Sequence, residues 1–206
     1  MTDKLNEMIE TAAAMVAPGK GILAIDESTG TCKKRFDSIG VECTENNRRD
    51  YRHMLLSAPD LGEHISGAIL FDETLRQSSA DGVPFTQIMQ DNGIIPGIKV
   101  DKGAHPLAGF EGEKITEGLD GLRERLAEYY ELGARFAKWR AVITIGDHIP
   151  SRYCIHTNAH ALARYAKICQ EGGLSPIVEP EVLMDGDHDI DRCEQVTTLT
   201  LNTVFD

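Results

Sequence analysis

Two spacings of apolar residues alternate along the chain. Short continuous apolar runs predict buried strands, and they cover residues 22–25, 66–71, 93–100, 135–145 and 174–178. Between these runs the apolar residues recur at helical spacing, which predicts helices at residues 3–16, 33–39, 45–56, 84–90, 116–132, 151–170 and 190–205. A regular alternation of strand and helix is typical of a parallel sheet whose crossovers are right-handed.

Two architectures fit this alternation: an open doubly wound sheet and a (β/α)8 barrel. A glycine-rich dinucleotide fingerprint is absent, and charged residues follow several strands, which favours the barrel because its active site lies at the carboxyl ends of the strands. Eight units at this spacing need roughly 300 residues, whereas the 206 residues contain five predicted strands. The last helix also reaches Asp206 without a stop signal. We therefore expect a single domain over residues 1–206, a TIM barrel truncated after about five βα units.

Composition narrows the class of protein. The chain is 41% hydrophobic and 26% charged, as in ordinary globular domains. Its net charge of −12 argues against nucleic acid and anionic membranes as partners. No apolar run approaches the roughly 20 residues of a membrane span, and the first residues lack a signal-peptide pattern. The five cysteines form no CxxC pair, so reduced thiols and a cytoplasmic location are expected.

The strand at residues 135–145 carries two cations among apolar residues. Side chains alternate across a strand, so Lys138 and Arg140 share a face. Burying two cations side by side is costly unless anions meet them. Their heads either reach solvent or carboxylates at the strand end, or they face an anionic ligand.

Charged or polar groups follow the other strands too. Gathered at one barrel mouth they form the set Asp26, Ser28, Lys99, Lys138, Arg140, Glu179 and Glu181. Lysine and arginine suit phosphate groups, a lysine crowded by cations can attack a carbonyl as the free amine, and nearby carboxylates can move protons. The set fits carbon–carbon bond chemistry on a phosphorylated sugar. An ion-pair network that only holds the barrel end together fits equally well.

Several long segments carry a resemblance to a known family. They are GKGILAIDESTG (19–30), NNRRDYR (46–52), GAILFDETL (67–75), GIKVDKG (97–103), PLAG (106–109), EGLDGL (117–122), FAKWR (136–140), NAHALARYA (158–166) and PIVEPEVLMDGDHD (176–189). Together they resemble class I fructose-bisphosphate aldolase. That family is a (β/α)8 barrel, commonly tetrameric, which cleaves fructose 1,6-bisphosphate (EC 4.1.2.13) through a lysine Schiff base, without a metal or other cofactor.

The resemblance implies a role for each matching residue. Asp26 matches an aspartate that assists proton transfer from the C4 hydroxyl, Glu179 a glutamate that acts as acid and base at the carbinolamine, and Lys138 a lysine that contacts the reacting carbons. Glu181 completes the expected catalytic set. The expected substrate-binding residues are Ser28, Thr31, Arg35, Arg48, Lys99 and Arg140.

One part of the family's site is expected beyond these residues. The Schiff-base lysine of the family belongs to a sixth strand, after Asp206, so this chain alone is expected to be inactive. Two other functions stay open: a metal-dependent aldolase or isomerase on a similar barrel, and a catalytically inactive phosphosugar-binding or scaffolding chain. His156 and His160 have the spacing of zinc ligands, but no third ligand is evident.

Overall fold

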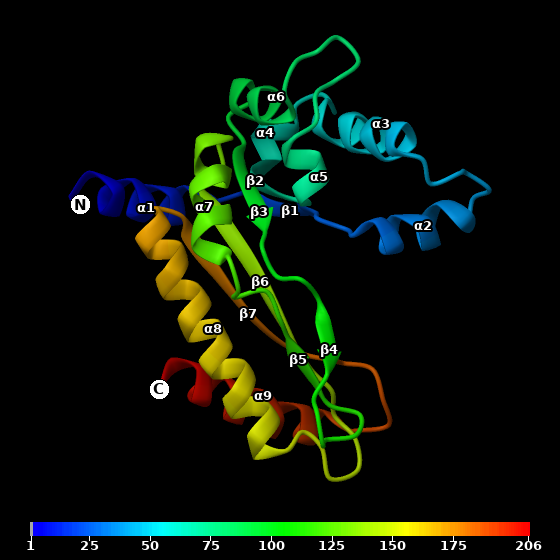
Figure 1. Ribbon diagram of the computed structural model, residues 1–206, viewed down its shortest axis with the longest axis vertical. Helices are drawn as coiled ribbons and strands as arrows, with labels where there is room; N and C mark the ends of the chain where they lie inside the picture. Colours follow the sequence, from blue (N-terminus) through cyan, green and yellow to red (C-terminus); the bar gives the residue numbers. More distant parts are fainter. Residues whose placement is uncertain (1) are drawn as a thin grey trace.

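The computed structural model describes residues 2–206. Within them a parallel sheet of five strands has the order β1-β2-β3-β6-β7, so each strand pairs with its neighbours along the chain (Figure 1). The strands are β1 (Gly21–Ile25), β2 (Ile65–Leu70), β3 (Ile95–Lys99), β6 (Phe136–Ile143) and β7 (Ser175–Val182). The sheet is curled as a half-barrel, which confirms the α/β class and the parallel sheet.

Helices connect the strands. They are α1 (Thr2–Met15), α2 (Thr29–Asp37), α3 (Glu45–Leu56), α4 (Leu61–His64), α5 (Asp72–Leu75), α6 (Phe85–Asp91), α7 (Leu122–Glu131), α8 (Arg152–Gly172) and α9 (Ile190–Phe205). The predicted bounds of α3 and α9 are confirmed, and the short α4 and α5 were not predicted. The long α8 runs beside β6 and β7 (Figure 1). Among the helices of residues 2–206, none combines the length and apolar character needed to cross a membrane.

The predicted helix at residues 116–132 is wrong over residues 116–121. Lys114–Thr116 is a strand, β5, which pairs antiparallel with β4 (Ala104–Pro106). α7 begins only at Leu122, because Gly118 and Gly121 adopt positive φ angles of 130° and 65°, outside the helical range. The two strands are too short for alternation to reveal them.

The strand β7 extends beyond its predicted end at residue 178. Ser175 and Leu183 donate backbone hydrogen bonds to β6, at 3.0 Å and 2.9 Å, so the positions between them alternate in the direction of their N–H groups. Pro180, which lacks an N–H, therefore faces away from β6, where it interrupts no bond of this pair. The longer strand carries Glu179 and Glu181 within its length rather than after its end.

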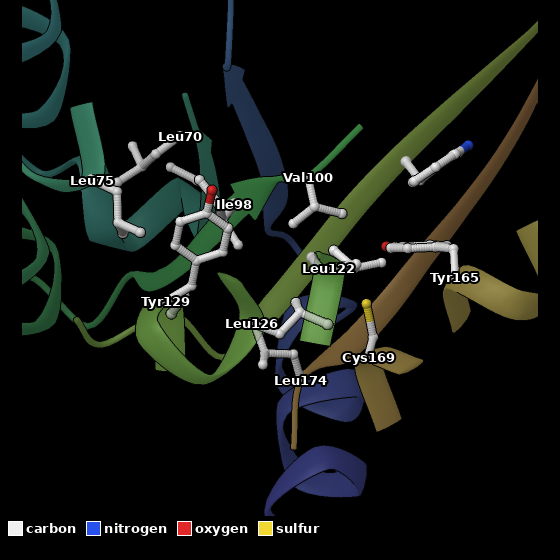
Figure 2. Packing of buried hydrophobic residues seen from close by; sticks show 14 of the residues in the cluster. Leu70, Leu75, Ile98, Val100, Leu122, Leu126, Tyr129, Tyr165, Cys169 and Leu174 are labelled. Carbon is white, nitrogen blue, oxygen red and sulfur yellow. The ribbon is translucent and has the colours of Figure 1, made fainter. Parts of the chain in front are cut away.

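The main core lies between the sheet and the helices that cover its convex side (Figure 2). Trp139 is fully buried there, and its ring centroid lies 5.4 Å from that of Tyr165 on α8. Leu126 and Leu162 belong to the same cluster. Because Trp139 points to the core, its neighbours on β6 point to the opposite, concave face.

Candidate active site

A cavity of about 980 Å³ lies at the carboxyl ends of the strands. Its lining includes a group of the predicted site residues: Asp26, Ser28, Thr31, Lys99, Lys138, Arg140, Glu179 and Glu181. They come from β3, β6 and β7, from the loop between β1 and α2, and from the first turn of α2. The parallel order of the strands therefore brings groups more than 150 positions apart in sequence into one hollow.

Lys138 is paired with two carboxylates. Its Nζ donates to Asp26 Oδ2 at 3.3 Å and forms an ion pair with Glu179 Oε2 at 3.2 Å. Burial lowers the pKa of this lysine, but Asp26 and Glu179 together outweigh burial and raise the pKa above 10.5. Lys138 is therefore a cation at neutral pH, and a free-amine nucleophile has to come from elsewhere.

The carboxyl of Glu179 has a pKa above that of an exposed glutamate. Burial raises the pKa of its carboxyl, Lys138 lowers it, and Glu181 raises it again, so that the net shift is upward. Its side chain keeps 34% of its exposed area, so the group has access to the cavity. A carboxyl with a raised pKa holds its proton to a higher pH than an exposed glutamate does, which suits a group that transfers protons.

Arg140 and Glu181 form the next pair along the same face. The Arg140 guanidinium donates through Nε to Glu181 Oε2, and this contact is the main cause that raises the pKa of Arg140. Both side chains are partly exposed. Arg140 therefore offers further donors to an anionic ligand in the cavity.

The turn after β1 has the form of an anion site. Ser28 caps the N-terminus of α2, and its Oγ accepts from the N–H of Thr31 at 3.4 Å and lies 3.2 Å from the Thr31 hydroxyl. A helix N-terminus beside two hydroxyls favours a phosphate group. Asp26 precedes this turn in the sequence and lines the same cavity as Ser28 and Thr31.

Asp101 is a site residue that the sequence reasoning missed. Its carboxylate accepts from Lys99 Nζ, from the N–H of Gly103 at 3.0 Å and from the N–H of Arg140 at 3.3 Å. Only 3% of its side chain is exposed, and Asp101 links the ends of β3 and β6 in the lining of the cavity. The signal in the sequence was its place two positions after Lys99, since alternate residues share a face.

Two predicted site residues lie outside the lining of the cavity. Arg35 is exposed and pairs with Glu27. Arg48, on α3, holds Glu73 through two parallel bonds of 2.8 Å and 2.6 Å. Their roles in substrate binding stay predictions.

A second group of polar and charged side chains lines the same cavity. It consists of Asp72, Arg76, Arg125 and Tyr129, and none of them was predicted. Burial raises the pKa of Asp72, but Arg76, Tyr129 and Arg125 together outweigh burial and lower the pKa overall. Within residues 2–206 no group of three or more His, Cys, Asp or Glu side chains has the geometry to hold a metal ion.

A family model described as fructose-bisphosphate aldolase class-I matches residues 7–206. This chain belongs to the class I fructose-bisphosphate aldolases. The aldolase chain is 68% identical over 201 residues to a probable fructose-bisphosphate aldolase class 1 of Xanthomonas campestris pv. campestris, covering 98% of this chain and 60% of the relative. It is 58% identical over 199 residues to the cytosolic fructose-bisphosphate aldolase 4 of Arabidopsis thaliana, covering 97% of this chain and 51% of that relative.

A solved structure extends the likeness to three dimensions. The fructose-bisphosphate aldolase of Plasmodium falciparum, in a ternary crystal with TRAP and a small molecule inhibitor, is 52% identical and superposes with a TM-score of 0.97. The match covers 100% of this aldolase chain and 60% of that chain. The aldolase chain thus spans about half to three fifths of the length of these relatives.

Proposed function

We propose that the complete protein carrying this chain cleaves fructose 1,6-bisphosphate reversibly into dihydroxyacetone phosphate and glyceraldehyde 3-phosphate through a lysine Schiff base. The observation that carries this proposal is the cation of Lys138 between Asp26 and Glu179 at the carboxyl ends of the strands. Family membership supports the choice of reaction.

Glu179 and Asp26 each transfer a proton in the proposed reaction. A lysine amine attacks the C2 carbonyl of the sugar, and Glu179 protonates the carbinolamine hydroxyl so that water leaves; its raised pKa suits this role. Asp26 then takes the proton of the C4 hydroxyl. The electron pair of the C3–C4 bond flows into the iminium, and the aldehyde product leaves. Lys138 stabilises negative charge that develops on the sugar hydroxyls.

The phosphates of the substrate need cationic and N–H donors. Ser28 and Thr31 offer a helix N-terminus, and Lys99 and Arg140 offer positive charge on the adjoining strands. Arg35 and Arg48 are proposed to join them once substrate competes with Glu27 and Glu73 for their guanidinium groups. Glu181 orients Arg140 in the resting state.

The remaining parts of the proposal concern the whole protein. The half-barrel is completed to a single-domain (β/α)8 barrel, and the Schiff-base lysine lies on a sixth strand that follows the present chain. The complete protein is a homotetramer in the cytoplasm, in keeping with the cytosolic name of the Arabidopsis relative. It uses no metal or other cofactor and binds neither nucleic acid nor membrane.

A second function has one observation in its favour. Two of the three lysines that line the cavity, Lys99 and Lys138, are each paired with a carboxylate, so neither of these two is placed to act as a free amine. A catalytically inactive chain that binds phosphosugars, or that holds a partner, would keep such a cavity. Its prediction is binding of fructose 1,6-bisphosphate without turnover.

Borohydride trapping separates these functions. The protein from its natural source is treated with dihydroxyacetone phosphate and borohydride, and its intact mass is measured. A reduced adduct, together with cleavage that persists in excess chelator, supports the Schiff-base lyase. Cleavage that chelator abolishes supports a metal-dependent aldolase, and binding with neither adduct nor cleavage supports the inactive chain.

A further inference from the structure

Arg52 is a buried arginine that the proposed reaction does not use. It lies on α3, and only 2% of its side chain is exposed. Its Nε donates to the carbonyl of Ile25 at 2.8 Å, and its Nη2 donates to the carbonyl of Glu27 at 2.9 Å. One planar guanidinium therefore holds the backbone on both sides of Asp26.

The backbone needs this support at that point. Ile25 is the last residue of β1 and pairs with Leu70 of β2, so the chain leaves the sheet as it reaches Asp26. Beyond Ile25 no ladder bond of the sheet fixes the turn before α2 begins at Thr29. The guanidinium of Arg52 supplies donors where a neighbouring strand no longer does.

The clamp also sets the direction of the Asp26 side chain. The carbonyls of Ile25 and Glu27 face Arg52, whereas the Asp26 carboxylate meets Lys138 Nζ at 3.3 Å in the cavity. Rotation of this turn would carry the carboxylate out of reach of Lys138, because a hydrogen bond weakens steeply with distance and angle.

A counter-charge keeps Arg52 in place. Glu27 Oε2 forms an ion pair with Arg52 Nη2 at 3.0 Å, and only 7% of the Glu27 side chain is exposed. Tyr51 donates to Glu27 Oε1 at 3.1 Å, and Arg35 pairs with the same oxygen. Arg52 Nη1 also donates to Cys32 Sγ on α2 at 3.1 Å. A buried guanidinium with this many partners is costly to move.

We infer that Arg52 is a positioning residue for Asp26: it touches no substrate, and it fixes the turn that aims the Asp26 carboxylate at the C4 hydroxyl. This inference rests on the proposed lyase function. A lysine at position 52 keeps the positive charge but offers a point donor in place of the planar fork, so it cannot hold both carbonyls in the same geometry.

The test uses the complete protein and a matched pair of variants, Arg52→Lys and Arg135→Lys. Arg135 also donates to two backbone carbonyls, of Tyr130 and Ala134 at 3.0 Å and 2.9 Å, and pairs with Glu7, but it lies at the amino end of β6. Two quantities decide the test: kcat for cleavage of fructose 1,6-bisphosphate, measured together with KM, and the hydrogen-exchange rates of the amides at positions 26–28.

Arg52→Lys is expected to lower kcat by about 10- to 100-fold, since small misplacements of a reacting group cost this much, with KM changed less than about threefold. Its amides at 26–28 exchange faster than in the wild type, while Arg135→Lys changes neither quantity. Equal loss of kcat in the two variants, or a normal kcat in Arg52→Lys, overturns the inference.

Failure of the proposed function gives a different result. A complete wild-type protein that neither cleaves the sugar nor traps an adduct rejects the lyase, and the amide exchange then decides alone whether Arg52 fixes the turn. Should Arg52→Lys not fold, Glu27→Gln keeps the size of the partner and removes its charge. The same fall in kcat and the same faster exchange are expected of it, and unchanged values overturn the inference.

Discussion

Lys138 Nζ lies 3.3 Å from Asp26 Oδ2 although β2 and β3 separate their strands in the sheet. Three strand spacings of roughly 4.8 Å would place the two backbones about 14 Å apart in a flat sheet. The contact therefore crosses the concave face of a curled sheet, and it couples the first strand to the fourth before any ligand binds.

Lys138→Met should remove most of the cleavage activity of the complete protein. The change deletes the cation between Asp26 and Glu179, so charge on the sugar hydroxyls loses its partner, and kcat is expected to fall by about 100-fold or more. The measurement is steady-state cleavage of fructose 1,6-bisphosphate. Lys33→Met, which breaks an exposed pair with Asp37, should keep the wild-type rate; equal rates in both variants would contradict the role of Lys138.

Glu179 and Glu128 should make opposite contributions to stability as pH changes. The pKa of Glu179 is raised above 4.5, first by burial, so its contribution to stability is complete below pH 4.5 and is lost as pH rises through the folded-state pKa. The pKa of Glu128 is lowered below 4.5, first by its hydrogen bond with Arg76. Its contribution is present above pH 4.5 and is lost as pH falls through the folded-state pKa.

Thermal unfolding of Glu179→Gln and Glu128→Gln in the complete protein checks these signs. The melting temperature of the wild type, taken relative to Glu179→Gln, should fall as pH rises from 4.5 to 8. Taken relative to Glu128→Gln, it should fall as pH drops below 4.5. If both differences in melting temperature changed with pH in the same direction, the opposite pKa shifts of Glu179 and Glu128 would be refuted.

Gly97→Ala should destabilise the fold although it adds a single methyl group. A Cβ at this position of β3 would lie 2.2 Å from the ring of Phe136, which is fully buried on β6. Overpacking of this kind costs about 1–3 kcal/mol, to be measured from denaturant unfolding of the complete protein. At Gly21 a Cβ meets nothing within 4 Å, so Gly21→Ala is the control. A loss of stability no larger than that of the control would be the adverse result.

Asp101→Asn should weaken substrate binding. Asp101 accepts from Lys99 Nζ and from the backbone N–H of Arg140, and the side chains of Lys99 and Arg140 are proposed to meet phosphate. Loosening a charge-assisted bond of this strength is expected to raise KM about tenfold, with a smaller effect on kcat. Asp91→Asn, which alters an exposed aspartate bonded to Gln87, should leave KM unchanged. A variant of Asp101 with normal KM would show that Lys99 needs no such support.

The 206 residues on their own should be inactive and of low stability. Within the described residues β1 pairs only with β2, and β7 only with β6, so both strands present open edges. Ile22 and Val178 on these strands are 37% and 36% exposed, and open apolar edges favour aggregation. Turnover of fructose 1,6-bisphosphate and the urea midpoint of this chain test the expectation. Turnover at a normal rate would refute it.

The sequence predicts the face of the sheet on which a strand side chain lies, because side chains alternate along a strand. The alternation of strand side chains puts Lys138 and Arg140 on one face, and Trp139 between them is buried on the other face. Asp26, Lys99 and Glu179 were grouped because parallel strands end at the same edge. These rules place a residue on an edge or a face, and they hold without knowledge of any partner.

Contacts between segments that are far apart in the sequence could not be predicted from alternation or from the parallel order of the strands. The clamp of Arg52 joins α3 to the turn at Asp26 across 25 positions and more, and no local pattern marks a guanidinium that bonds carbonyls. The hairpin of β4 and β5 has three residues in each strand, too few for alternation to be read. Arg48 and Glu73 pair across 25 positions. The residues around Arg48 in the sequence do not indicate that its guanidinium is bound to Glu73.

The order of the strands has a consequence for the nascent chain. Each strand of the sheet lies beside the strand that precedes it in sequence, so every new strand that leaves the ribosome finds its partner already present. Parallel strands need a crossover connection, and pairing with the preceding strand of the sheet keeps the sequence separation smaller than pairing with a more distant strand would. The sheet can therefore grow one strand at a time from β1. Asp26 can pair with Lys138 only after β6 has been translated.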